Sequence, residues 1–149
     1  MWRLRRHPWL VLAAVVFLAL SFQLARWLSL ENIERDDISA LLVAQAHGDA
    51  SAMLAALSGC DESCRSTVRE DARRLRRPGS IQILAYQSQT AYSLTSTTGF
   101  TRVAWKSSLQ LLPVVQCFTV RRSGNALSGL TLRLVRVSLP LANTQGDCR

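Results

Sequence analysis

Four cysteines, at positions 60, 64, 117 and 148, are the residues whose spacing implies chemistry most directly. Their even number, and their place downstream of an apolar N-terminal run, are typical of a domain that folds in an oxidising compartment. Four cysteines allow three pairings. We expect a C-x₃-C disulfide between Cys60 and Cys64, and by elimination a second bridge between Cys117 and Cys148.

The sequence lacks the usual patterns of metal sites and catalytic sites. No second C-x₂₋₄-C and no H-x₃₋₅-H accompanies the cysteines, so we expect no zinc. His47 is the sole histidine after the apolar run, and its place before Gly48 predicts the last turn of a helix. The segment 81–138, predicted to form the sheet, contains no Asp or Glu that could serve as a general base. We therefore expect no cofactor, no metal and no enzymatic activity.

Four side chains on predicted strands could line a ligand pocket instead of packing in the core: Tyr86, Tyr92, Trp105 and Gln116. Gln116 shares a strand face with Val114 and Phe118, so its amide needs a polar partner or a pocket. Core packing is the expected use of Trp105, and a pocket floor is the alternative.

Basic side chains recur at helical spacing on a predicted third helix: Arg65, Arg69, Arg73 and Arg76. This stripe could contact an anionic surface or an acidic partner. The alternative is a solvated helix face whose charge Glu70 and Asp71 partly neutralise.

The net charge of +8 and the pI near 10.6 do not by themselves predict a nucleic-acid partner. Seventeen of the eighteen basic residues are Arg, with Lys106 alone, and Ala and Leu are abundant. A GC-rich coding sequence produces this composition whatever the ligand, so we expect no nucleic-acid binding.

An uncharged apolar run from Trp9 to Ala25 is long enough to span a membrane as a helix. The arginines at 3, 5 and 6 precede it and acidic residues follow it, which predicts a cytoplasmic N-terminus. Residues 1–30 are then a tip and anchor, and residues 31–149 an exported domain. The alternative is a secretory signal cleaved near residues 19–21, which would release a secreted protein.

The exported part divides into helices followed by strands. Helices are predicted over 32–47, after the Asp49 cap up to Gly59, and after the Asp61 cap up to Pro78. Strands are predicted near 80–88 and 90–96, which can also form one bent strand, and near 100–107, 114–122 and 129–138, with hairpin signals at 96–99 and 123–125. A change of apolar phase after Leu134 predicts a β-bulge. The expected class is α+β, with an N-terminal transmembrane helix and two or three helices packed on a curved antiparallel sheet of four or five strands.

Several short motifs carry a resemblance to known proteins. The run from Gly79 to Asp147 resembles a family of small exported or membrane-anchored actinobacterial proteins of unassigned function, on TAYSL at 90–94, TGFTRVAW at 98–105, PVVQC at 113–117 and VRRSGNALSG at 120–129. The order of helices and meander also looks like the cone-shaped cystatin-like or nuclear-transport-factor-two-like superfamily. That superfamily hosts enzymes, ligand binders and membrane-complex scaffolds, so the resemblance implies a fold and little chemistry.

Together these features favour a non-enzymatic, membrane-anchored envelope protein with an accessory or interaction domain, whose partners would be the membrane and another envelope protein. The alternative is a cone-shaped domain that binds a small molecule or lipid.

Overall fold

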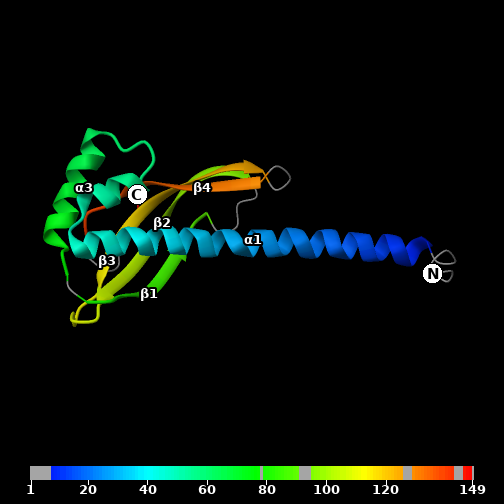
Figure 1. Cartoon of the computed structure of the whole chain (residues 1–149), viewed down its shortest axis with the longest axis horizontal. Coiled ribbons are helices and arrows are strands. Elements are labelled where there is room, and N and C mark those ends of the chain that lie inside the picture. Colours follow the sequence, from blue (N-terminus) through cyan, green and yellow to red (C-terminus); the bar gives the residue numbers. More distant parts are fainter. Residues whose placement is uncertain (1–7, 78, 91–94, 126–128, 143–145, 149) are drawn as a thin grey trace.

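The computed structural model describes residues 8–77, 79–90, 95–125, 129–142 and 146–148. The elements follow in the order α1 (Pro8–His47), α2 (Ala50–Ala56), α3 (Glu62–Arg74), β1 (Ile81–Ser88), β2 (Thr95–Ser107), β3 (Val114–Asn125) and β4 (Gly129–Val137). Figure 1 shows α1 running past the sheet, with its N-terminal half projecting from the rest of the molecule. The α+β class is confirmed.

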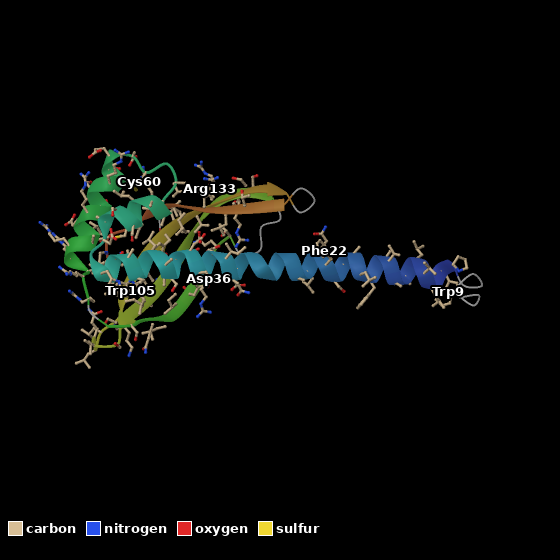
Figure 2. The ribbon with its side chains drawn as sticks, in the orientation of Figure 1. Trp9, Phe22, Asp36, Cys60, Trp105 and Arg133 are labelled. Atoms are coloured by element: carbon tan, nitrogen blue, oxygen red, sulfur yellow. A yellow bond between two sulfur atoms is a disulfide. The ribbon has the colours of Figure 1, made fainter. Side chains whose placement is uncertain are left out.

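Helix α1 is continuous for 40 residues and includes both the apolar run and the predicted 32–47 helix. Residues Pro8–Ala25 are apolar, exposed and long enough to cross a membrane, which fits a membrane anchor or a signal sequence. Trp9 and Phe22 lie on the projecting half, whereas Trp105 lies in the folded domain (Figure 2). The expected boundary at residue 30 therefore falls inside one helix.

The helix end predicted at Gly48 and the helix starts predicted after Asp49 and Asp61 are confirmed by their caps, whereas α2 and α3 end before the predicted limits, at Ala56 and Arg74. Gly48 takes φ +75°, and two hydrogen bonds close the end of α1: its N–H donates to the carbonyl of Gln45, and the Asp49 N–H donates to that of Ala44. The Asp49 carboxylate accepts from the first turn of α2, and the Asp61 carboxylate accepts from the Cys64 N–H in α3.

The sheet is an antiparallel meander in the order β1-β2-β3-β4. The predicted hairpin at 96–99 is wrong, because these residues belong to β2, where Thr98 pairs with Arg121. The predicted separate strand over 90–96 is also wrong where it can be examined: residues 91–94 lie outside the described residues, and Thr95 begins β2. A 13-residue strand rich in Thr at its start looks like two strands in sequence because Gly99 lies within it. Of the second hairpin signal, residues 123–125 are the end of β3, and residues 126–128 lie outside the described residues.

The predicted bulge in the last strand is confirmed. Thr119 pairs with Arg136 and Val120 with Leu134, so Val135 is the extra residue of β4. The bulge restores the apolar phase, because Leu134 and Val137 are then both buried in the core.

Both predicted disulfides are present. The first joins Cys60, which precedes α3, to Cys64 in the first turn of α3. The second joins Cys117 in β3 to Cys148 in the C-terminal tail. The two bridges indicate an oxidising, extracytoplasmic compartment. A cluster of buried apolar side chains includes residues of all three helices and of β2, β3 and β4, among them Leu42, Met53, Val68, Trp105, Phe118 and Leu134.

Candidate functional site

A buried ion pair joins α1 to the sheet near the point where the apolar part of α1 leaves the domain. Arg122 Nη2 in β3 lies 2.9 Å from Glu34 Oε2 in α1, and the two side chains are 1% and 0% exposed. Thr101 in β2 and Thr90 after β1 also donate to the Glu34 carboxylate. A buried carboxylate with this many donors is fully compensated, so it fixes the position of the helix on the sheet.

The environment of Glu34 determines its charge. Burial alone would raise the pKa of Glu34, but the hydrogen bonds from Thr101 and Arg122 outweigh it and hold the pKa below its ordinary value. The buried hydroxyl of Tyr86 faces the same carboxylate outside hydrogen-bond geometry. Burial and then the nearby Glu34 raise the pKa of Tyr86, so this hydroxyl stays protonated.

A second buried polar network surrounds Gln116, further along α1. Gln116 Oε1 accepts from Trp105 Nε1 at 2.8 Å and from Gln45 Nε2 at 3.0 Å. Its amide nitrogen donates to the carbonyl of Ser138 at 3.0 Å. Gln116 thus has partners on α1, on β2 and after β4, and all three amide and indole side chains are fully buried.

Asp71 of α3 completes this network and differs from the sequence expectation. The sequence predicts Asp71 on a solvated face among arginines, but the side chain is fully buried, and its Oδ2 accepts a hydrogen bond from Gln116 Nε2 at 3.3 Å. Its Oδ1 is buried without a hydrogen-bond partner among the described residues. Burial, reinforced by the charge of Glu70, raises the pKa of Asp71 to about 7.

The four candidate pocket residues are therefore not brought together as one set. Trp105 and Gln116 bond to each other in the interior, Tyr86 belongs to the Glu34 cluster, and Tyr92 lies outside the described residues. Within the described part of the chain, no group of three or more metal-ligating side chains is present. Through buried hydrogen bonds between side chains, the two networks connect elements that are distant in sequence.

Three members of the predicted arginine stripe, Arg65, Arg69 and Arg73, lie on the exposed side of α3, whereas Arg76 lies beyond the end of the helix at Arg74. Arg65 and Arg69 each lie 3.8 Å from a carboxylate oxygen of Glu62, and all three side chains are more than half exposed. Glu70 pairs with Arg74 rather than with the stripe. Arg73 and Arg76 are exposed as well, and Arg76 lies close to Gly48 at the end of α1. Asp71 does not neutralise the stripe, since it is directed into the domain.

A hollow of about 430 Å³ opens between α2 and α3 beside this stripe. Leu54 and Leu57 of the α2 region form its apolar side, and Arg65 and Arg69 form its basic side. Gly59 and the disulfide-bonded Cys60 complete the lining. We call this the α2–α3 groove.

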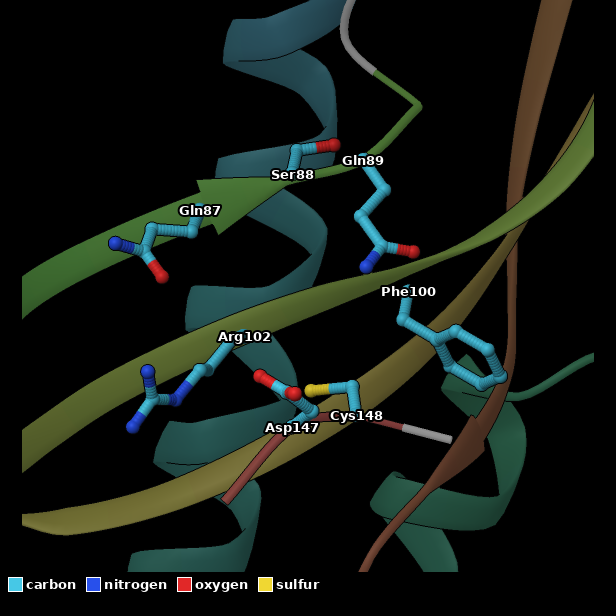
Figure 3. A pocket seen from close by; sticks show the side chains of 7 residues that line it. All are labelled: Gln87, Ser88, Gln89, Phe100, Arg102, Asp147 and Cys148. Atoms are coloured by element: carbon cyan, nitrogen blue, oxygen red, sulfur yellow. The ribbon is translucent and has the colours of Figure 1, made fainter. Parts of the chain in front are cut away.

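Two smaller hollows lie on the face of the sheet that is turned away from the hydrophobic core, and both are lined by Gln87 and Arg102. One, of about 140 Å³, is bordered by Phe100 and by Asp147 of the C-terminal tail (Figure 3). The other, of about 200 Å³, is lined by small apolar residues that include Ala104 and Val115. The buried Nε of Arg102 has no hydrogen-bond partner among the described residues.

Sequence reasoning missed Glu34, Arg122 and Asp71, although a signal for each was present. Glu34 lies on the same face of its helix as the buried residues Ile38, Leu41 and Gln45. Arg122 lies on the same strand face as the buried Val120 and Phe118. Asp71 lies on the same helix face as the buried Cys64 and Val68. Each charged residue lies on the apolar face of its own element, and this position predicts burial with a partner.

The fold and the buried networks define an α+β domain on a long helix whose apolar end projects from it. Comparison with protein-family models, with curated proteins and with solved structures finds no match to this chain. Its function must therefore be argued from its own residues.

Proposed function

We propose that this protein is a single-pass, non-enzymatic interaction module of the cell envelope, with a cytoplasmic N-terminus and an extracytoplasmic domain held at a fixed distance from the membrane. The observation that carries the proposal is the continuity of α1, which is exposed and apolar over Pro8–Ala25 and bonded into the domain at Glu34 and Gln45. A continuous helix of this kind would hold the domain at a constant distance from the bilayer.

The distances along α1 support this arrangement. At 1.5 Å per residue, Glu34 lies about 14 Å beyond Ala25 and Ala46 lies about 30 Å beyond it. The arginines at 3, 5 and 6 favour the cytoplasmic side for the N-terminus. The two disulfides support the opposite compartment for the domain.

The small-molecule alternative has less support. A cone-shaped binding domain needs an open interior of about 300 Å³ or more lined by apolar side chains. Trp105 and Gln116, which would line such an interior, are fully buried and bonded to each other. We keep the packing of the helices on one face of a curved sheet, as in the cone-shaped superfamily, as part of the proposal of an interaction module.

In-cell photocrosslinking tests the proposal. A benzophenone amino acid at Leu111, which is 97% exposed in the β2–β3 loop, or at the exposed Arg73 should give adducts with another envelope protein. Replacing residues 28–30 by Gly-Pro-Gly should reduce these adducts several-fold, because it breaks α1, whereas Ala-Ala-Ala at the same positions should preserve them. Absence of any protein adduct would overturn the interaction role, and equal adducts from both replacements would overturn the fixed mounting.

A further inference from the structure

The α2–α3 groove combines an apolar side with a basic side. Leu54 is only partly buried and presents apolar surface to the groove, whereas Leu57 is 7% exposed and connects this side of the groove to the hydrophobic core. Arg65 and Arg69 border the same hollow. A ligand that uses both sides needs apolar side chains and anionic groups within one short stretch.

The basic side of the groove has charge available for a ligand. The two arginines share Glu62, and both ion pairs are long, at 3.8 Å, and solvent-exposed. Ion pairs of this kind contribute little and exchange readily with a better-placed carboxylate. Arg73, one turn further along α3, adds exposed positive charge that none of the described ion pairs neutralises.

The place of α3 in the fold determines which anionic partner the groove can reach. The Arg77 N–H donates to the carbonyl of Ala46, so α3 ends beside the last turn of α1. In Figure 1, α3 lies crosswise at the end of α1 that is opposite the N-terminus. On the topology of the proposed function, this end stands about 30 Å from the membrane-spanning segment, several screening lengths from the lipid headgroups.

From these observations we infer that the α2–α3 groove is a docking site for an acidic amphipathic segment of a partner protein. Carboxylates of the segment replace Glu62 as partners of Arg65 and Arg69, and its apolar side chains pack on Leu54 and on the exposed edge of Leu57. A wall polymer with phosphate groups would use the arginines but not the leucines, so the apolar side favours a polypeptide. This inference rests on the proposed function and names the class of partner.

Fluorescence anisotropy with the full chain in zwitterionic nanodiscs tests the inference. The probe is a labelled Glu/Leu peptide about four turns long, with leucines at i, i+3, i+4 and i+7. It should bind saturably, and the variant R65Q/R69Q should weaken binding about tenfold. The matched control R121Q/R133Q removes the same charge from two paired, exposed positions of β3 and β4, and should change binding less than about twofold.

Three outcomes would overturn the inference. Equal weakening by both double variants would mean that the probe responds to net charge alone. A peptide in which Ser replaces every Leu, binding as tightly as the probe, would show that the leucines of the groove are not used. Displacement of the probe by poly(glycerol phosphate), or by vesicles of phosphatidylglycerol, at the same charge concentration would assign the stripe to a polymer or a lipid. Crosslinks from Leu111 would still support the proposed function in each case.

Discussion

Arg122 and Glu34 form an ion pair at 2.9 Å that connects β3 to α1 across 88 residues of sequence, with neither side chain in contact with solvent. The pair lies at the point where the long helix leaves the domain. Removing one partner of a buried pair costs more than removing both, because the remaining charge has no compensation.

The first prediction concerns this pair. Glu34→Leu should lower the free energy of unfolding by about 3–5 kcal/mol, because it leaves the Arg122 guanidinium buried and uncompensated. The double variant Glu34→Leu with Arg122→Met should recover most of that loss. Urea unfolding measures both. Arg136→Met, which removes an exposed ion pair with Asp61, is the control and should cost no more than about 1 kcal/mol. A double variant no more stable than Glu34→Leu alone would contradict the role assigned to the pair.

Asp71 should make the stability of the domain depend on pH. Because its pKa is raised to about 7, the folded state holds the proton more tightly than the unfolded chain, whose carboxyl has a pKa near 3.8. The resulting stabilisation is complete below pH 3.8 and is lost as the pH rises through about 7. Asp71→Asn should therefore raise the melting temperature at pH 8 and flatten the profile between pH 4 and pH 8. A variant profile parallel to that of the parent protein would refute this assignment.

The two disulfides should contribute unequally. The Cys117–Cys148 bridge closes a segment with a sequence separation of 31, and the Cys60–Cys64 bridge one of 4. On the chain-entropy model, Cys117→Ser with Cys148→Ser should cost about 3.5 kcal/mol, and Cys60→Ser with Cys64→Ser about 2 kcal/mol. Urea unfolding under non-reducing conditions gives both values. The reverse order would mean that packing of the tail, rather than loop closure, dominates.

The apolar half of α1 should anchor the uncleaved chain. Mass spectrometry of the membrane fraction should find residues 1–21 still attached, and alkaline carbonate should not extract the protein. Leu18→Arg should reduce the carbonate-resistant fraction, because an arginine at the centre of a span costs about 2.5–3.5 kcal/mol. Leu111→Arg places the same charge on an exposed loop leucine outside the candidate span and should have no effect. A mature chain that begins near residue 21 in the soluble fraction would favour the cleaved signal.

The sequence predicted those elements whose signals are local. The caps at Asp49 and Asp61, the end of α1 at Gly48 and the bulge after Leu134 each depend on a few neighbouring residues, and all are confirmed. The continuity of α1 was missed because the composition changes from apolar to acidic near residue 31, whereas backbone hydrogen bonding does not depend on that change.

The candidate site was less accessible to sequence reasoning. Glu34 bonds to Arg122, 88 positions away, and Asp71 bonds to Gln116, 45 positions away. The spacing of apolar residues around each charged residue predicts its burial but does not identify its partner. The helical spacing of Arg65 and Arg69 was visible in the sequence. Their association with Leu54 and Leu57 depends on how α2 and α3 meet, and only the fold supplies that.

On the topology of the proposed function, the unbroken helix between Ala25 and Glu34 couples the rotation of the domain about the membrane normal to the rotation of the membrane-spanning segment. Each residue added or removed between them would turn one relative to the other by about 100°. A neighbouring transmembrane helix that packs against one side of Pro8–Ala25 would always meet the same side of the folded domain. The lateral geometry of an assembly would then be specified by the number of residues in a short helical stretch.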